Sequence, residues 1–167
     1  MTAIYSGMRH CGRVKVLQTE IGRGVFAARR FEPEETIGEV RGRVMDDPEY
    51  ASTYCIEINA NRSLEPFSPF RYLNHCCEPN CELAYWDEIE QKTGERQLWV
   101  QALKTIEAGE ELLIDYAWAA DAAIPCLCRA PTCRGWIVDL NDMARLKERL
   151  AEEQEEATVK ELLSRHG

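Results

Sequence analysis

The chain has 167 residues, of which 45% are hydrophobic and 29% charged, a composition typical of a globular protein with one modest core. The formal net charge of −9 disfavours direct binding to a nucleic-acid backbone and favours basic partners. No apolar run approaches the roughly 20 residues of a membrane span, and the first residues lack the apolar core of a signal peptide. We therefore expect an intracellular protein, cytoplasmic or, in a eukaryote, nuclear, whose eight cysteines stay reduced.

The N-terminal part of the chain predicts short β-strands. The runs VKV (14–16), GVFA (24–27) and TIGEVRG (36–42) favour strands and are separated by glycine and proline. TYCIEIN (53–59) alternates polar and apolar residues and predicts another strand. The stretch 60–70 contains two prolines and is predicted to be a loop.

The second half of the chain predicts a hairpin, a final strand and a helix. The hairpin covers 83–106, with Lys92, Thr93 and Gly94 near its turn, and the strand lies within 107–116. From residue 141 onward, strong helix formers without proline predict a C-terminal helix over 139–167. Asn141 is the expected N-cap, and Asp142 complements the helix dipole. The apolar stripe of this helix is only partial, so we expect light packing on the domain, a partner or a second copy.

Four cysteines have the number and spacing of a zinc site. Cys126, Cys128 and Cys133 form a C-x-C-x4-C pattern in a polar, turn-like segment, and Cys81 closes the block RYLNHCCEPNC (71–81). Four thiolates complete a tetrahedral zinc shell. We therefore predict a structural Zn²⁺ that ties this segment to the 71–81 loop and makes its folding metal-dependent.

Other ligand sets remain open at this stage. Cys76, Cys77 or Cys11 can replace Cys81 as the fourth thiolate, His75 is a competing ligand, and buried free cysteines would leave no metal site at all. A nucleophilic pair of His75 and Cys76 is disfavoured, because adjacent side chains on a strand point apart and no orienting acid is evident.

Small-molecule recognition is indicated by two further patterns. Asn74 and His75 together supply hydrogen-bond donors and acceptors in a loop beside the predicted metal site, although a lone histidine is more often structural. The G-x-G of Gly22 and Gly24 is weak by itself, because the third glycine and the helix of a dinucleotide fingerprint are missing.

Taken together, these blocks resemble the SET-domain protein lysine methyltransferases. The resemblance covers about residues 14–138, and the blocks that carry it are IGRGVFA (21–27), EVRG (39–42), RYLNHCCEPNC (71–81), GEELLIDY (109–116) and CLCRAPTCRGWI (126–137). It implies a mainly β fold of several small sheets. A pseudoknot would form between the 71–81 segment and the strand ending at Tyr116, and a zinc-bound post-SET flap would follow. The implied domains are a SET domain over 14–118, a post-SET zinc segment over 119–138 and the C-terminal helix over 139–167.

The resemblance also implies a cofactor and a reaction. S-adenosylmethionine would donate a methyl group to a lysine of a basic protein segment, such as a histone tail, whose main chain adds as a β-strand to a sheet edge. Tyr116 would orient the target amine, and Tyr54 is a second catalytic candidate near the lysine channel. Trp136 would cover the adenine as an apolar lid. The remaining implied cofactor-binding residues are Gly22, Arg23, Gly24, Val25, Arg71, Asn74, His75 and Tyr116.

Three positions depart from the family pattern. Val40 replaces the usual tyrosine of the E-Y-x-G block, Cys76 replaces a serine, and Ile114 replaces an aromatic residue two positions before Tyr116. Val40 favours the alternative function, a catalytically inactive peptide-binding module with the SET fold. Tyr116 and the intact Asn74–His75 pair favour the enzyme. A methyltransferase for a non-protein amine is a third alternative.

Overall fold

The computed structural model describes residues 12–59, 61–85 and 97–165. These residues form two compact units. Unit 1 takes in 12–75 and 79–114, and unit 2 takes in 76–78 and 115–165. In the part of the chain described, no helix combines the length and apolar character needed to cross a bilayer.

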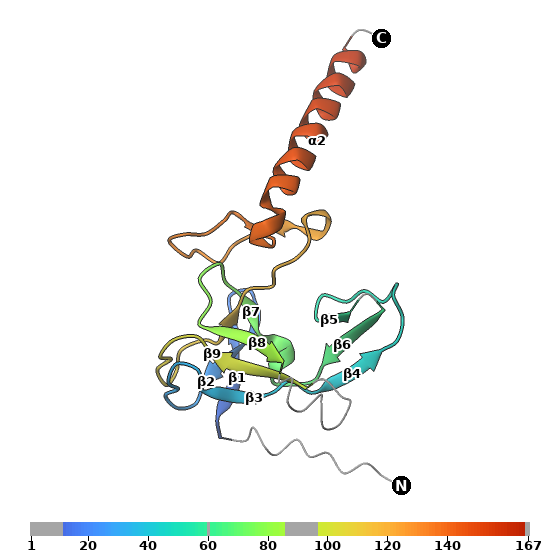
Figure 1. The fold of residues 1–167 in the computed structure, drawn as a ribbon. Helices are drawn as coiled ribbons and strands as arrows, with labels where there is room; N and C mark the ends of the chain where they lie inside the picture. Colours follow the sequence, from blue (N-terminus) through green and yellow to red (C-terminus); the bar gives the residue numbers. More distant parts are fainter. Residues whose placement is uncertain (1–11, 60, 86–96, 166–167) are drawn as a thin grey trace. The chain divides into compact units, whose positions relative to one another are not determined.

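Unit 1 consists of small sheets, as predicted (Figure 1). Strands β1 (Val14–Thr19) and β2 (Gly22–Ala27) form an antiparallel pair. A three-stranded sheet has the order β3-β9-β8, with bounds Thr36–Glu39, Leu98–Ala102 and Cys81–Tyr85. A second sheet has the order β4-β6-β5, with bounds Gly42–Met45, Arg62–Pro66 and Ile56–Asn59.

A short parallel pair joins distant parts of unit 1. Strand β7 (Asn74–His75) pairs with β10 (Leu113–Ile114). The buried side chain of Asn80 continues this connection, because its Nδ2 donates to the backbone oxygen of Glu111 at 2.8 Å and its Oδ1 accepts from the backbone N–H of Leu113 at 2.8 Å. These are the two segments that the resemblance places in a pseudoknot.

The core of unit 1 follows from the period-two pattern of its strands. In β9, Leu98, Val100 and Ala102 are buried while the residues between them are partly exposed. Further apolar side chains from several segments close the core, and the largest that are fully buried are Phe31, Ile37, Ile106, Leu112, Val25 and Val100. Burial of these side chains is the main stabilising contribution to the unit.

The predicted loop over 60–70 is wrong in part. Residues 62–66 form β6, the central strand of its sheet, because Leu64 and Pro66 alternate inward and are buried. Pro66 is tolerated because it is the last residue of the strand, facing Gly42 of β4 and lying past the last partner in β5. The predicted hairpin is confirmed in its strands, since β8 and β9 pair antiparallel, whereas its turn at Lys92, Thr93 and Gly94 lies outside the described residues.

Unit 2 contains one long helix and several short elements. Its strands β11 (Ile124–Pro125) and β12 (Trp136–Ile137) pair antiparallel, and short 3-10 turns cover Ala120–Ala122 and Leu140–Asp142. Helix α2 runs over Met143–Ser164, so the C-terminal helix is confirmed. The small core of the unit is formed by Ala120, Ala123, Val138 and Leu146, against which Trp136, Met143 and Leu150 pack.

The predicted N-cap at Asn141 is wrong. The chain is already helical from Leu140 in a 3-10 turn, and Asp139 caps that turn by accepting from the backbone N–H of Asn141 at 2.7 Å. The side chain of Asp142 instead accepts from the backbone N–H of Ala120 at 2.9 Å. This contact fixes the base of α2 to the segment that follows Tyr116.

Helix α2 packs only through its first two turns, which makes a direct test possible. Leu146 is 1% exposed, whereas Leu163, on the same helix, is 70% exposed. We expect Leu146→Ala to lower the free energy of unfolding by about 2–5 kcal/mol, because it leaves a cavity in a small core. Leu163→Ala should change it by less than about 0.5 kcal/mol. Denaturant unfolding followed by far-UV circular dichroism measures both, and equal effects would contradict this packing.

Candidate functional site

In unit 1, Asn74 joins three segments that the sequence motifs singled out. Its Nδ2 donates to the backbone oxygen of Arg23 at 3.0 Å and to Glu111 Oε1 at 2.7 Å. Both partners are acceptors, so the amide orientation is fixed and Asn74 Oδ1 is turned away from them. The structure therefore brings predicted residues of β2 and β7 together, and it adds Glu111, which the motif reasoning did not single out.

The two glycines of the G-x-G pattern have different physical roles. Gly22 has φ +128°, a conformation that residues with a Cβ rarely adopt, at the turn between β1 and β2. Gly24 has an ordinary φ, but a Cβ there would collide with Glu111 Oε1 and lie 3.0 Å from Thr19 Cγ2. Gly24 thus allows the Glu111 carboxylate to lie against the backbone of β2.

Val25 and His75 are buried, at 0% and 9% exposure. The carbonyl of Val25 accepts from the backbone N–H of Leu112 at 2.7 Å, and His75 pairs with Ile114 across the β7–β10 connection. Through these contacts the strand segment before Asp115 is held between β2 and β7. Both residues therefore have a structural part in the site, whatever ligand it takes.

Arg71 and Tyr54 lie against each other. Arg71 belongs to the 3-10 turn Phe70–Tyr72, and its guanidinium carbon is 4.3 Å from the centroid of the Tyr54 ring. Its Nη2 also pairs with Glu65 Oε1 at 3.3 Å. A guanidinium over an aromatic face is stabilised by the ring quadrupole. Tyr54 therefore holds a predicted cofactor-binding residue in place.

Arg23 and Tyr72 border a cavity on the same unit. Arg23 Nη1 donates to the Tyr72 hydroxyl at 2.9 Å. The cavity has a volume of about 430 Å³, and its lining residues are Val16, Leu17, Gln18, Arg23, Ser68 and Tyr72. Of these, only Arg23 was predicted from the sequence, because the rest belong to no recognisable motif.

Unit 2 contains a cluster of four cysteines. Cys77 Sγ lies 3.8 Å from Cys126 Sγ and 3.9 Å from Cys133 Sγ. The sulfur atoms of Cys77, Cys126 and Cys128 and a ring nitrogen of His75, the competing ligand, lie within 4.8 Å of one another. Zn–S bonds of about 2.3 Å give a tetrahedron whose S···S edges are about 3.8 Å. The cluster therefore fits a tetrahedral zinc ion closely.

The backbone around the cluster is arranged to stabilise thiolates. Each sulfur accepts from at least one backbone N–H: Cys77 from Arg134 at 3.4 Å, Cys126 from Cys128 at 3.5 Å, Cys128 from Cys77 at 3.5 Å and Cys133 from Gly135 at 3.4 Å. Such outer contacts orient metal ligands and increase affinity. Burial raises the pKa of Cys77. Burial also acts to raise the pKa of Cys128, but hydrogen bonds, chiefly from the backbone N–H groups of Cys77 and Ala130, outweigh it and lower that pKa to about 6.

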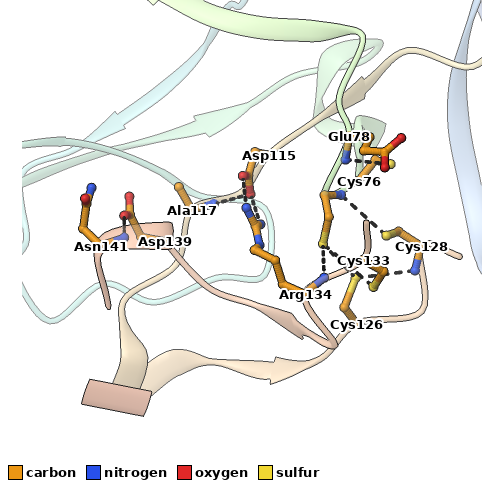
Figure 2. A network of polar contacts seen from close by, with 11 residues as sticks. Cys76, Glu78, Asp115, Ala117, Cys126, Cys128, Cys133, Arg134, Asp139 and Asn141 are labelled. Carbon is orange, nitrogen blue, oxygen red and sulfur yellow. Dashed lines mark hydrogen bonds and ion pairs between the residues drawn. The ribbon is translucent and has the colours of Figure 1, made fainter. Parts of the chain in front are cut away.

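The prediction of Cys81 as the fourth ligand is wrong, because Cys77 occupies that place. Cys81 is the first residue of β8, faces Ala102 of β9 and is 0% exposed in the core of unit 1. Burial raises the pKa of its thiol to about 12, which disfavours the thiolate that a metal requires. Cys76 is also buried and accepts from the backbone N–H of Glu78 at 3.4 Å (Figure 2).

Tyr116, the principal catalytic candidate, lies in unit 2 beside an ion pair. Its ring stacks on Trp118, with centroids 5.4 Å apart and planes 30° apart. The preceding residue, Asp115, pairs with Arg134 through two contacts of 2.6 and 2.7 Å (Figure 2). The hydrogen bond with Asp115 raises the pKa of Arg134, so this guanidinium stays charged. Trp136, the predicted lid, packs against the small core of unit 2.

Comparison with known proteins gives a consistent set of relatives. A family model described as SET domain matches residues 22–117. Histone-lysine N-methyltransferase ASHR3 of Arabidopsis thaliana is 31% identical over 142 residues, which cover 75% of this chain and 28% of the relative. A histone-lysine N-methyltransferase of Schizosaccharomyces pombe, described as H3 lysine-4 specific, is 35% identical over 130 residues, which cover 68% of this chain and 14% of the relative.

The fold has a counterpart among solved structures. The crystal structure of a proposed histone methyltransferase of Plasmodium falciparum aligns with a TM-score of 0.51 and 21% identity, covering 61% of this chain and 90% of that chain. At this identity the likeness shows the fold alone. The chain spans less than a third of the length of the curated relatives described above.

Proposed function

Since this chain belongs to the SET domain family, we propose that it is an S-adenosylmethionine-dependent protein-lysine N-methyltransferase acting on a basic protein segment. The observation that carries this proposal is the junction of Asn74, Arg23 and Glu111. The Glu111 carboxylate and the Arg23 carbonyl both accept from Asn74 Nδ2, which leaves the Asn74 amide oxygen directed away from them. Such a group of acceptors suits the ammonium and sulfonium charges of S-adenosylmethionine.

When bound, the cofactor supplies an electrophilic methyl group. The Asn74 oxygen and the Glu111 carboxylate would receive its cationic groups, and the missing side chain of Gly24 makes room for that carboxylate against the backbone of β2. Tyr54 supports the set indirectly through Arg71. The proposed cofactor-binding residues of unit 1 are Gly22, Arg23, Gly24, Val25, Arg71, Asn74 and His75, and the parts of Tyr116 and Trp136 remain predictions from the resemblance.

The target lysine must reach the methyl group as a neutral amine. Free lysine has a pKa of about 10.4, so neutralising it near pH 7.4 costs about 4 kcal/mol. An apolar channel and the nearby sulfonium charge both lower this pKa. We assign the orientation of the amine to the hydroxyl of Tyr116, since alignment of the reacting atoms is the main contribution that a protein makes to such a displacement.

A structural zinc ion is the second proposed component. Cys77, Cys126, Cys128 and Cys133 would hold it, on the grounds of their sulfur spacing and their N–H···S contacts. Closed four-thiolate sites are structural, because they leave no position for a substrate. The ion would therefore organise unit 2 around Tyr116 without taking part in methyl transfer.

The substrate proposal rests on charge and on the relatives. The net charge of −9 attracts basic segments, and relatives described as histone-lysine N-methyltransferases make a histone tail the first candidate. Its main chain would add to a sheet edge as a strand.

The proposal is tested by transfer of labelled methyl from S-adenosylmethionine to a panel of histones and to whole-cell lysate. We expect labelled bands with the wild type, and Tyr116→Phe should reduce them by about 100-fold or more, because the amine loses its orienting hydroxyl. Tyr85→Phe is the matched control, since this tyrosine lies on β8 and its hydroxyl donates to the backbone carbonyl of Glu57 at 3.4 Å in an exposed contact. The absence of labelling by folded, zinc-loaded protein would contradict the enzyme and favour a peptide-binding module.

A further inference from the structure

A bidentate ion pair links the residue before Tyr116 to the loop that carries the last cysteine. Arg134 Nη1 lies 2.6 Å from Asp115 Oδ2, and Arg134 Nη2 lies 2.7 Å from Asp115 Oδ1. The Arg134 side chain is only 9% exposed and that of Asp115 is 28% exposed. Figure 2 shows the two side chains facing each other beside the cysteine cluster, and both residues belong to unit 2.

Each partner is fixed by a second contact. Asp115 Oδ1 also accepts from the backbone N–H of Ala117 at 3.1 Å, and Ala117 has φ +46°, so the chain makes a left-handed turn directly after Tyr116. Arg134 follows Cys133 in sequence, and its backbone N–H donates to Cys77 Sγ at 3.4 Å. Arg134 therefore contacts the cysteine cluster through its backbone N–H and the turn that contains Tyr116 through its side chain.

The chemistry of the pair is suited to positioning. A bidentate guanidinium–carboxylate contact fixes distance and orientation together, which a single hydrogen bond does not. Buried ion pairs contribute little net stability because desolvation offsets the attraction, so geometry is their better-attested use. Arg134 Nε is buried and has no hydrogen-bond partner within the described residues, which leaves the two terminal nitrogens as the polar contacts of this side chain.

We propose that Arg134 and Asp115 are positioning residues. Through their ion pair, the folded cysteine cluster fixes the position of Tyr116. The backbone on both sides of Tyr116 is held, by Asp115 before it and by the Ala117 turn after it, and the ring is supported by Trp118. The effect on methyl transfer rests on the proposed function. The effect on the Tyr116–Trp118 ring pair does not.

The first test separates the role of the Arg134–Asp115 ion pair, which we call the clamp, from that of the proposed metal site. We compare Arg134→Met and Arg134→Lys with Arg145→Met, a matched control whose side chain is 63% exposed. Arg134→Met should keep about one zinc ion per chain and full helicity, yet lose the near-UV circular dichroism band that a Trp118→Phe variant identifies. Arg134→Lys should retain part of the band, because one ammonium cannot bridge both carboxylate oxygens. Loss of zinc from Arg134→Met, or an unchanged band, would overturn the proposal.

The second test uses coupling to the Tyr116 hydroxyl. Arg134→Met should lower kcat by about 100-fold, whereas in a Tyr116→Phe background it should lower single-turnover methyl transfer by less than about 3-fold, because the group it positions is already absent. Equal losses in both backgrounds would indicate a general structural role and contradict the clamp. Asp115→Asn tests the same pair if Arg134→Met fails to fold. A wild type that transfers no methyl group would refute the proposed function, while the ring-pair measurement would still decide on the clamp.

Discussion

Cys77→Ala is expected to abolish zinc binding and to disorder unit 2, whereas Cys81→Ala is expected to leave the zinc bound. Cys77 is one of four sulfur atoms at tetrahedral spacing, and its own sulfur accepts a backbone hydrogen bond from Arg134. Structural zinc contributes apparent binding free energies of roughly 10–16 kcal/mol, which small units need in order to fold. The buried core of unit 2 consists of four apolar residues, so we expect the folding of this unit to depend strongly on the proposed metal.

The measurement is metal analysis of purified protein, with limited proteolysis to report the order of residues 115–165. The wild type and Cys81→Ala should each carry about one zinc ion per chain, and Cys77→Ala should carry almost none. Cys81→Ala should cost about 1 kcal/mol of stability, because it removes one buried sulfur from the core of unit 1. Zinc lost from Cys81→Ala but kept by Cys77→Ala would restore Cys81 as the ligand.

The error over Cys81 shows where spacing alone fails. Cys77 and Cys81 both lie in the block RYLNHCCEPNC, and count and spacing do not separate them. The structural surroundings of the two cysteines do distinguish them. Cys81 begins the strand CELAY, which pairs with an apolar strand, whereas Cys77 lies in the turn-like HCCEPN that leads to it. A cysteine on an inward position of a core strand is more often a buried apolar residue than a ligand.

Local patterns predicted most of the regular structure. The strands β1, β2, β3 and β5, the β8–β9 pairing and helix α2 follow from alternation, punctuation and helix propensity in short windows, whereas β4 begins at Gly42, where the predicted run ends. Strand β6 was missed because two prolines outweighed the Leu64–Pro66 alternation, and only the neighbouring strands show that Pro66 needs no donor. The predicted N-cap, Asn141, lies one residue before the N-cap of α2, Asp142, because a 3-10 turn precedes the helix.

The candidate site was predictable as a set of residues but not as a set of contacts. The motifs supplied Asn74, Arg23 and Tyr116 by resemblance. The contact of Asn74 with Glu111 and the contact of Asp115 with Arg134 became visible only in the fold, because each joins residues 19 or more positions apart in sequence. Tyr116, the cysteine cluster and the base of α2 share unit 2, so we expect the proposed metal and the helix both to affect the position of Tyr116.

The block 71–81 contains two asparagines, Asn74 and Asn80, whose substitutions are expected to have opposite effects on cofactor binding and on stability. Asn74 and Asn80 both contact the 111–114 segment, but they use different atoms of the side-chain amide. Asn80 is buried, and both ends of its amide are used by the backbone, to Glu111 and Leu113 at 2.8 Å each. Asn74 is partly exposed and uses only its Nδ2 in these contacts. We infer that Asn80 stabilises the β7–β10 connection and that Asn74 serves the ligand.

Asn74→Ala should therefore weaken S-adenosylmethionine binding by about 10- to 100-fold, because a hydrogen bond to a charged group is lost, while stability falls by only about 1 kcal/mol. Asn80→Ala should do the reverse. It leaves a buried N–H and a buried carbonyl without their partner, each costing about 1–3 kcal/mol, so it lowers the unfolding free energy by about 2–5 kcal/mol. Calorimetric titration with S-adenosylmethionine and denaturant unfolding separate the two effects. If Asn74→Ala lost stability as Asn80→Ala does but bound the cofactor normally, Asn74 would be a structural residue and the acceptor-rich junction would not be the cofactor site.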